Sequence, residues 1–214
     1  MSFTLKRGLS NVYAAEILSD DNETGEGHGY KTGVPFHLIP AGEMSRSVDS
    51  ENANVYYDNV VFYASGKEGA TEIVVSGAAL RPADVANITG KTVDAATGAI
   101  LDSGEYKEKY FALGGQADNT DGTHEFFWFL KGTFQVPEQN DKTKDDSTDT
   151  NGMELTFNAI QTTHLFDVGD EKKPMKRVVI DTETTELKAE QDWTAQVVTP
   201  DNLSTVCQKV TAAS

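Results

Sequence analysis

The sequence has 214 residues, of which 18 are lysine or arginine and 34 are aspartate or glutamate, giving a formal net charge of −16. An acidic surface repels phosphate backbones, which argues against a sequence-specific DNA-binding protein. The single cysteine, Cys207, excludes an internal disulfide and a multi-cysteine metal site.

The chain shows no sign of export or of membrane insertion. Residues 1–8 lack the apolar segment of a secretory signal, and no apolar run approaches the ~20 residues of a membrane span. We therefore expect a protein that is made in the cytoplasm and has no membrane partner. The length fits one domain, because all-β domains often reach ~200–250 residues.

The first 80 residues predict strands separated by polar loops. The strands are expected at residues 9–18, 34–39, 55–64 and 71–78. Residues 19–33 predict a loop rich in Asp, Glu and Gly, and residues 42–50 a polar connection. Asp58 and Asn59 interrupt the third apolar run, which indicates a turn or bulge there.

One short helix is expected, at residues 82–88. Pro82 suits the first helical position, and Gly90 suits the end. The next residues, 92–101, predict a small hairpin with Thr97 and Gly98 at its turn.

The centre of the chain carries the strongest pattern. Residues 106–113 predict a strand, residues 114–123 a turn-rich connection, and residues 125–136 a second, very apolar strand. The alternation of that strand predicts one buried face, formed by Phe126, Trp128, Leu130, Phe134 and Val136. Phe127 and Phe129 are also apolar, so we expect its first half to be covered on both faces.

Residues 153–159 alternate in the same way and predict Leu155 and Phe157 as core residues. The connection from Pro137 to Asn151 is far longer than the two to five residues that a hairpin needs. Further strands are expected at residues 177–180 and 193–197.

Strands that do not alternate with helices favour an antiparallel sheet. The predicted fold is mainly β: an antiparallel sandwich or barrel with one short flanking helix and long loops between strands. We assign residues 1–181 to this domain. Residues 182–214 are either a strand or arm of their own or a part of the same domain.

No catalytic, cofactor or metal site is expected, and we do not predict an enzyme. The histidines, at positions 28, 37, 124 and 164, do not have metal-ligand spacing, and neither a Gly-x-Ser-x-Gly motif nor a phosphate-binding loop occurs. Residues 141–146 match a calcium loop only in their acidity. Carboxylates are plentiful, so a glycosidase-like pair stays open.

Several segments are similar to the major tail protein, or tail tube protein, of long-tailed, non-contractile bacteriophages. They are FFWFLKGTF at 126–134 with the following PE at 137–138, KTKDDS at 142–147, LTF at 155–157, GLSNVYA at 8–14 and VYYDNVVFY at 55–63. The likeness covers most of the chain up to about residue 180.

This resemblance implies a β-sandwich that assembles with itself. In the family, six subunits form a ring in which strands join edge to edge, and the rings stack into a tube around the tape measure protein. The tail terminator and distal tail proteins are further partners, and DNA passes through the lumen without specific binding. The expected location is the virion tail, after assembly in the host cytoplasm.

The resemblance also implies two assembly loops. The matching ring-stacking loop contains Pro137, Glu138, Asp141, Lys142, Lys144, Asp145, Asp146 and Asp149. The matching second loop contains Glu43, Arg46, Asp49, Glu51, Tyr56 and Asp58.

Two other readings of the pattern are open. A β-sandwich binding module of the carbohydrate-binding or adhesion type predicts a stable monomer with exposed aromatic rings on one sheet face. A β-rich hydrolase is the third alternative.

Overall fold

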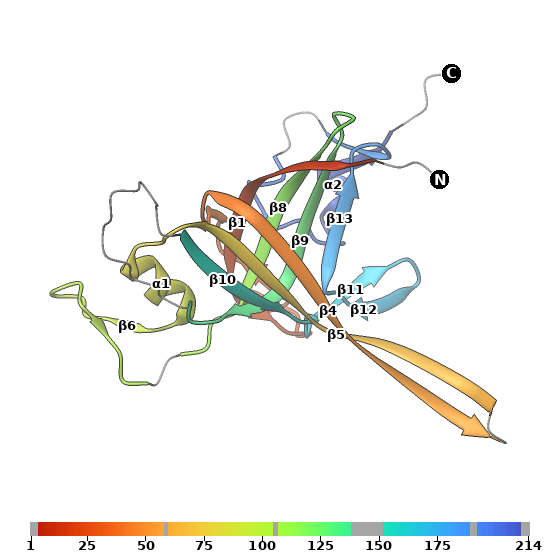
Figure 1. Cartoon of the computed structure of the whole chain (residues 1–214), viewed down its shortest axis with the longest axis horizontal. Helices are drawn as coiled ribbons and strands as arrows, with labels where there is room; N and C mark the ends of the chain where they lie inside the picture. The colour runs from red at the N-terminus through yellow and green to blue at the C-terminus, as the bar shows by residue number, and fades with distance from the viewer. Residues whose placement is uncertain (1–3, 58–59, 105–106, 138–151, 189–191, 211–214) are drawn as a thin grey trace, which may run out of the picture.

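The computed structural model describes residues 4–57, 60–104, 107–137, 152–188 and 192–210, and the side chains in these ranges apart from residues 50–67. Its centre is a nine-stranded sheet with the order β2-β1-β8-β9-β10-β5-β4, and β3 and β13 also pair with β1 and β9 (Figure 1). Every pairing is antiparallel. The mainly β, antiparallel, sandwich-like fold expected from the sequence is confirmed, and the sheet does not close into a barrel.

The strands of the main sheet are β1 (Lys6–Asp20), β2 (Tyr30–Thr32), β3 (Phe36–His37), β4 (Ala41–Tyr57), β5 (Val60–Ala78), β8 (Phe111–Asn119), β9 (His124–Phe134), β10 (Gly152–Ala159) and β13 (Arg177–Asp181). The small hairpins pair β6 (Thr92–Val93) with β7 (Ile100–Leu101), β11 (Leu165–Val168) with β12 (Glu171–Pro174), and β14 (Thr185–Leu187) with β15 (Cys207–Lys209). The helices are α1 (Pro82–Thr89) and α2 (Leu203–Val206).

Two apolar clusters lie on opposite faces of β9. The inner cluster joins alternate residues of β9, β10, β5 and α1, which include Phe127, Phe129, Leu155, Phe157, Ile73, Val75, Val85 and Ile88. The outer cluster contains Trp128, Leu130, Phe166, Val178, Ile180, Trp193, Val197, Val198 and Val206. The expectation that the first half of this strand is covered on both faces is therefore confirmed.

The predicted helix and hairpin are found where the sequence places them. Pro82 begins α1, and Gly90 ends it with φ 74°, a left-handed conformation that glycine adopts without strain. A Cβ at Gly90 would also lie 1.9 Å from the carbonyl oxygen of Lys107. β6 and β7 then form the small hairpin expected at residues 92–101.

The turn-rich connection predicted at residues 114–123 is wrong, because β8 continues to Asn119. Gly114 and Gly115 are strand residues on which aromatic rings rest. A Cβ built on Gly114 would lie 2.5 Å from Cδ2 of Trp128, and one on Gly115 would lie 2.6 Å from Cζ of Phe127. The turn itself is limited to residues 120–122. The strand predicted from residue 106 begins only at Phe111.

Phe134 does not share a face with Trp128. β8 pairs Phe111 with Gly132 and Leu113 with Phe129, so β9 has one more residue than its partner in this interval. Such a bulge reverses the facing of all later residues. Phe134 therefore packs in the inner cluster, with its ring 4.9 Å from that of Phe157.

Apart from the facing of Phe134, the burial of the six predicted core residues is close to that expected. All are buried except Phe126, which is half-buried and packs on the Trp193 ring at 5.6 Å. Val136 lies beyond the end of β9 and is 49% exposed, so its assignment to the buried face is wrong.

The strand expected at residues 193–197 is not formed. Trp193 and Val197 are nevertheless buried in the outer cluster, where Trp128 Nε1 donates a hydrogen bond of 3.2 Å to the carbonyl oxygen of Trp193. Residues 192–210 therefore cover the outer side of β9 and β13 by irregular chain, α2 and β15. β2 and the β11–β12 hairpin were not expected from the sequence either.

Candidate assembly surface

The strand β4 lies at the end of the sheet and is unusually long. It has 17 residues and pairs with β5, of 19 residues, from Ala41 opposite Gly77 to Tyr57 opposite Val60. The two strands extend beyond the body of the protein in Figure 1. Within the described part of the chain, the other edge of β4 has no strand partner. An unpaired edge presents backbone N–H and C=O groups that can pair with another chain.

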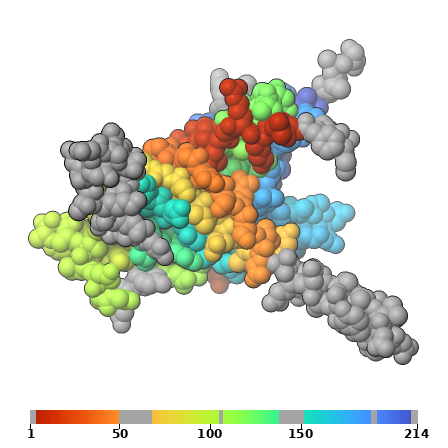
Figure 2. Space-filling model, in the orientation of Figure 1, coloured from red at the N-terminus to blue at the C-terminus, as the bar shows by residue number. Residues whose placement is uncertain are grey.

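The register of three strands creates a polar outer face next to this edge. Its rows across β4, β5 and β10 are Glu43, Ser76 and Glu154; Ser45, Val74 and Thr156; and Ser47, Glu72 and Asn158. We call these nine residues the polar face. Its only charged residues are the exposed carboxylates Glu43, Glu72 and Glu154. The three strands lie side by side at the front of the molecule in Figure 2, orange, yellow and teal.

The inner side of β4 has a different chemistry. Met44, Arg46 and Val48 alternate toward the inner cluster, opposite Val75, Ile73 and Thr71 of β5. Arg46 thus occupies a position that is apolar on the neighbouring strands. Its guanidinium carbon lies 4.0 Å from the centre of the Phe127 ring, a cation–π contact.

Arg46 also connects β4 to the far part of the sheet through Glu125. Arg46 Nη1 lies 3.5 Å from Glu125 Oε1, and Lys6 Nζ lies 2.9 Å from Glu125 Oε2. Burial by itself would raise the pKa of Glu125, but Lys6 and Arg46 outweigh that effect and hold the pKa below its ordinary value. Burial lowers the pKa of Arg46, and Glu125 opposes that shift.

The predicted second assembly loop is not a loop. Glu43, Arg46 and Asp49 lie in β4, as does the backbone of Glu51 and Tyr56, while Asp58 lies outside the described residues. The polar composition of residues 43–49 gives no apolar alternation that would predict a strand, because the outer residues are Ser and Glu and the inner side includes an arginine. A role of these residues in assembly stays a prediction.

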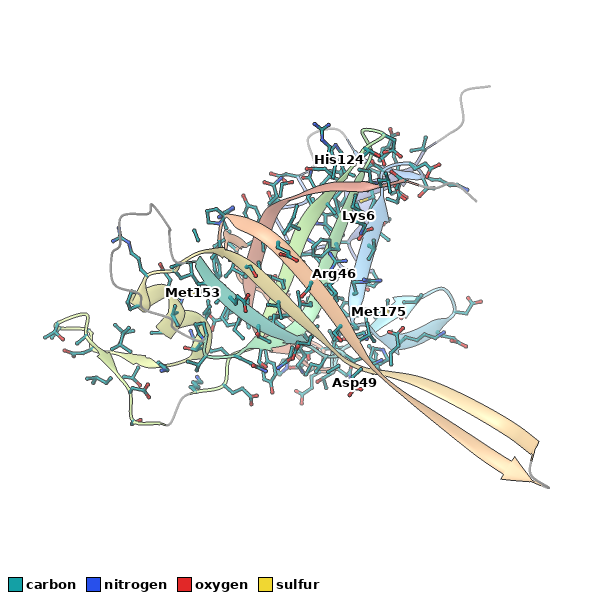
Figure 3. All side chains as sticks on the ribbon, in the orientation of Figure 1. Lys6, Arg46, Asp49, His124, Met153 and Met175 are labelled. Carbon is teal, nitrogen blue, oxygen red and sulfur yellow. The ribbon has the colours of Figure 1, made fainter. Side chains whose placement is uncertain are left out.

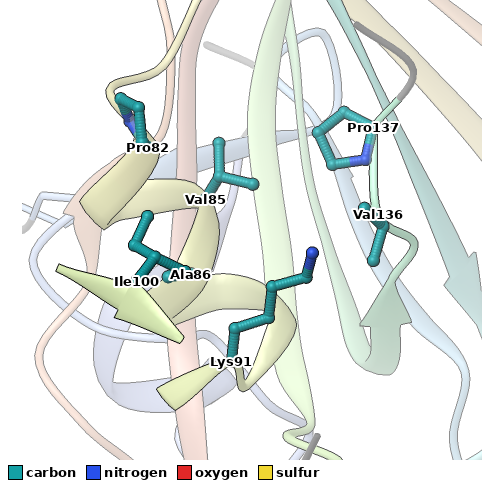
Figure 4. A pocket seen from close by; sticks show the side chains of 7 residues that line it. All are labelled: Pro82, Val85, Ala86, Lys91, Ile100, Val136 and Pro137. Atoms are coloured by element: carbon teal, nitrogen blue, oxygen red, sulfur yellow. The ribbon is translucent and has the colours of Figure 1, made fainter. Parts of the chain in front are cut away.

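Of the predicted ring-stacking loop, only Pro137 is described. Pro137 is buried and lines a cavity of about 250 Å³ together with Val136, Val85 of α1 and Ile100 of β7 (Figure 4). Lys91 borders the same cavity and forms an ion pair of 2.6 Å with Asp102. The other residues predicted for this loop, which are Glu138, Asp141, Lys142, Lys144, Asp145, Asp146 and Asp149, lie outside the described residues.

Ser10, Asp118 and His124 form a polar cluster near the C-terminal end of β8. Asp118 accepts hydrogen bonds from Ser10 Oγ at 3.3 Å and from Gln116 Nε2 at 2.6 Å, and its carboxylate lies 2.7 Å from His124 Nδ1. Asp118 thus lies between the hydroxyl and the imidazole. A serine nucleophile needs the base next to its hydroxyl instead, so this cluster does not have the arrangement of a catalytic triad.

A second polar cluster holds the end of β1 to the rest of the fold. The carboxylate of Asp20 is only 6% exposed and accepts hydrogen bonds from Lys131 Nζ and from the backbone N–H groups of Thr163 and His164. Burial alone would raise the pKa of Asp20, but these donors outweigh it and lower the pKa. These contacts connect β1, β9 and the segment before β11. Asp20 therefore has a structural role.

In the described ranges, no three His, Cys, Asp or Glu side chains gather in a way that could hold a metal ion. Neither of the two described helices has the length and apolar character needed to cross a membrane. No protein-family model matches the sequence, and the search of curated proteins returns no relative.

Proposed function

We propose that this chain is a structural protein that assembles with copies of itself into rings, and that the rings stack into the tail tube of a long-tailed bacteriophage. The observation that carries the proposal is the free edge of β4, a strand of 17 residues that has no partner on one side among the strands that the structure describes. Pairing with a neighbouring subunit would satisfy these backbone groups, and closure of a ring leaves no edge unpaired.

The polar face supports the same proposal. Its charged residues are carboxylates only, and it adjoins the edge at which subunits would join. If the strands β10, β5 and β4 of each subunit face the lumen, DNA meets a surface that repels its phosphates. Such repulsion favours passage without specific binding. The tape measure, tail terminator and distal tail proteins are then the proposed partners.

The carbohydrate-binding alternative finds less support in the described residues. Such a module needs several aromatic rings on an exposed face. Both tryptophans, Trp128 and Trp193, are buried in the outer cluster, and Phe36 is the one phenylalanine among the described side chains that is exposed.

Analytical ultracentrifugation and electron microscopy over a wide concentration range test the proposal. We expect rings or tubes of constant width, because each subunit in a ring would form two interfaces of standard size, ~1,600 Å² each. A protein that stays monomeric at ~1 mM, without rings or tubes, would contradict it, since interfaces of that size give stable association.

Hydrogen exchange identifies the strand that joins the subunits. Assembly should slow the exchange of amides in β4 that point away from β5. Amides of β9 are bonded to strands on both sides already and serve as the internal control. Equal exchange of β4 in monomer and assembly would show that its edge is not the interface.

A further inference from the structure

A cleft of about 340 Å³ opens between the inner side of the β4–β5 hairpin and β13. Its lining includes Phe129 of β9 and three cationic side chains, Arg46, Lys176 and Arg177. Figure 3 shows Arg46 between β4 and β13. The lining also includes one carboxylate, that of Glu68, so cationic side chains outnumber anionic ones here although the net charge of the chain is −16.

The three cations differ in how they are paired. Lys176 Nζ lies 3.1 Å from Glu68 Oε2, and Arg46 is paired with Glu125. Arg177 is exposed and forms no ion pair with any residue that the structure describes. Among the side chains that the structure describes, no carboxylate therefore balances the charge of the Arg177 guanidinium in the cleft.

Two guanidinium groups share the floor of the cleft. The guanidinium carbons of Arg46 and Arg177 lie 5.7 Å and 5.6 Å from the centre of the Phe129 ring. After burial, which is the largest cause, the charge of Arg177 also contributes to lowering the pKa of Arg46. A carboxylate between them would remove this repulsion, and a guanidinium can bind both carboxylate oxygens at once.

We infer that this cleft receives a carboxylate side chain from a second copy of the chain when the copies pair along the free edge of β4. The inference rests on the proposed self-assembly. Arg46 and Val48 belong to β4 and line the cleft, so a neighbour bonded to that edge runs past its mouth. The neighbour is strongly acidic, so its charge complements the cleft.

A different role is available for Arg46 alone. A charge that points inward on an edge strand can protect the edge from unwanted pairing. That role would be lost with Arg46 and does not involve Arg177. Variants of Arg177 therefore separate the two explanations.

The test compares the assembly of the full-length wild-type chain with that of Arg177→Glu, Arg177→Lys and Arg7→Glu by sedimentation and electron microscopy. Arg7 is an exposed arginine on β1, so Arg7→Glu makes the same change of net charge away from the cleft. We expect Arg177→Glu to weaken association about tenfold or more, since repulsion replaces a charged contact. Arg177→Lys should be intermediate, because lysine keeps the charge and loses the fork of donors.

The outcomes distinguish this inference from the proposed function. If the wild type assembles and Arg177→Glu assembles as well as Arg7→Glu, the cleft is not a contact and only this inference is wrong. If the wild type never assembles, both are wrong. Circular dichroism checks the fold of each variant, and Arg177→Gln replaces Arg177→Glu if the latter does not fold. High salt should reduce the difference between wild type and Arg177→Gln.

Discussion

The strands β9 and β4 belong to one sheet but differ in how many of their edges are paired and how many of their faces are packed. β9 is bonded to β8 on one edge and to β10 and β13 on the other, and it is packed on both faces. β4 is bonded on one edge, packed on its inner face and polar on its outer face. The comparison indicates that the packing contributions to folding are concentrated around β9, whereas one edge of β4 is not covered by any strand that the structure describes.

The largest expected effect tests the packing of β9. Truncating Trp128 to alanine should lower the free energy of unfolding by roughly 3–5 kcal/mol, because it leaves a cavity in the outer cluster. Val48→Ala on β4 is a smaller truncation, at a side chain that is 47% exposed, and it should cost less than ~1 kcal/mol. Urea denaturation measures both, and similar losses would mean that the two strands do not differ as described.

The next effect concerns the glycines beneath the aromatic rings. Gly114→Ala places a Cβ against the Trp128 ring and should destabilise the fold by about 1–3 kcal/mol. Gly42 on β4 is the control, since a Cβ there would have its nearest neighbour at 3.8 Å, in ordinary contact. Thermal unfolding of both variants measures the difference. Equal melting temperatures would show that β8 can move away from the ring without cost.

A pH dependence distinguishes the cluster at Asp20 from surface carboxylates. Because the pKa of Asp20 is lower in the folded chain, its contribution is present above the unfolded pKa of ~3.9 and is lost as pH falls through the folded pKa. Asp20→Asn should therefore cost about 1–3 kcal/mol at neutral pH and progressively less in acid. Asp167→Asn, on the exposed β11–β12 hairpin, is the control for denaturation at each pH. A constant difference between wild type and Asp20→Asn from neutral to acidic pH would refute the assignment.

The smallest effect concerns the contact that holds β4 to the body. Arg46→Ala removes the cation–π contact with Phe127 and should cost about 0.5–2 kcal/mol. Lys6→Ala removes the ion pair between the exposed Lys6 side chain and Glu125, which also pairs with Arg46. This change should cost about 0–1 kcal/mol, and less at high salt. A larger loss for Lys6→Ala than for Arg46→Ala would contradict the view that Arg46 stabilises the fold through its contact with Phe127.

The sequence predicts those elements whose signals are local. The alternation of β10 and the Pro82 and Gly90 signals of α1 depend only on near neighbours, and both elements are found. The two covered faces of β9 also follow from its run of aromatic residues.

Other features depend on contacts that are distant in sequence. The bulge in β9 shows only in its register with β8, and Gly114 resembles a turn residue until the Trp128 ring above it is known. Trp193 is buried without belonging to a strand. For the candidate site, the family resemblance places Arg46 and Asp49 in a loop, and the strand that contains them is apparent only from its pairing with β5. The sequence offered no signal for the cleft at Arg177, because β4 and β13 meet only in the fold.

The placement of both tryptophans in the outer cluster determines what their fluorescence can report. Trp128 and Trp193 are the only tryptophans in the chain, and both lie on the side of β9 that faces away from the inner cluster. Their emission will follow the loss of that cluster during unfolding. Subunit pairing at β4 should leave the emission wavelength unchanged, so fluorescence can measure subunit stability inside an assembly as directly as in the free chain.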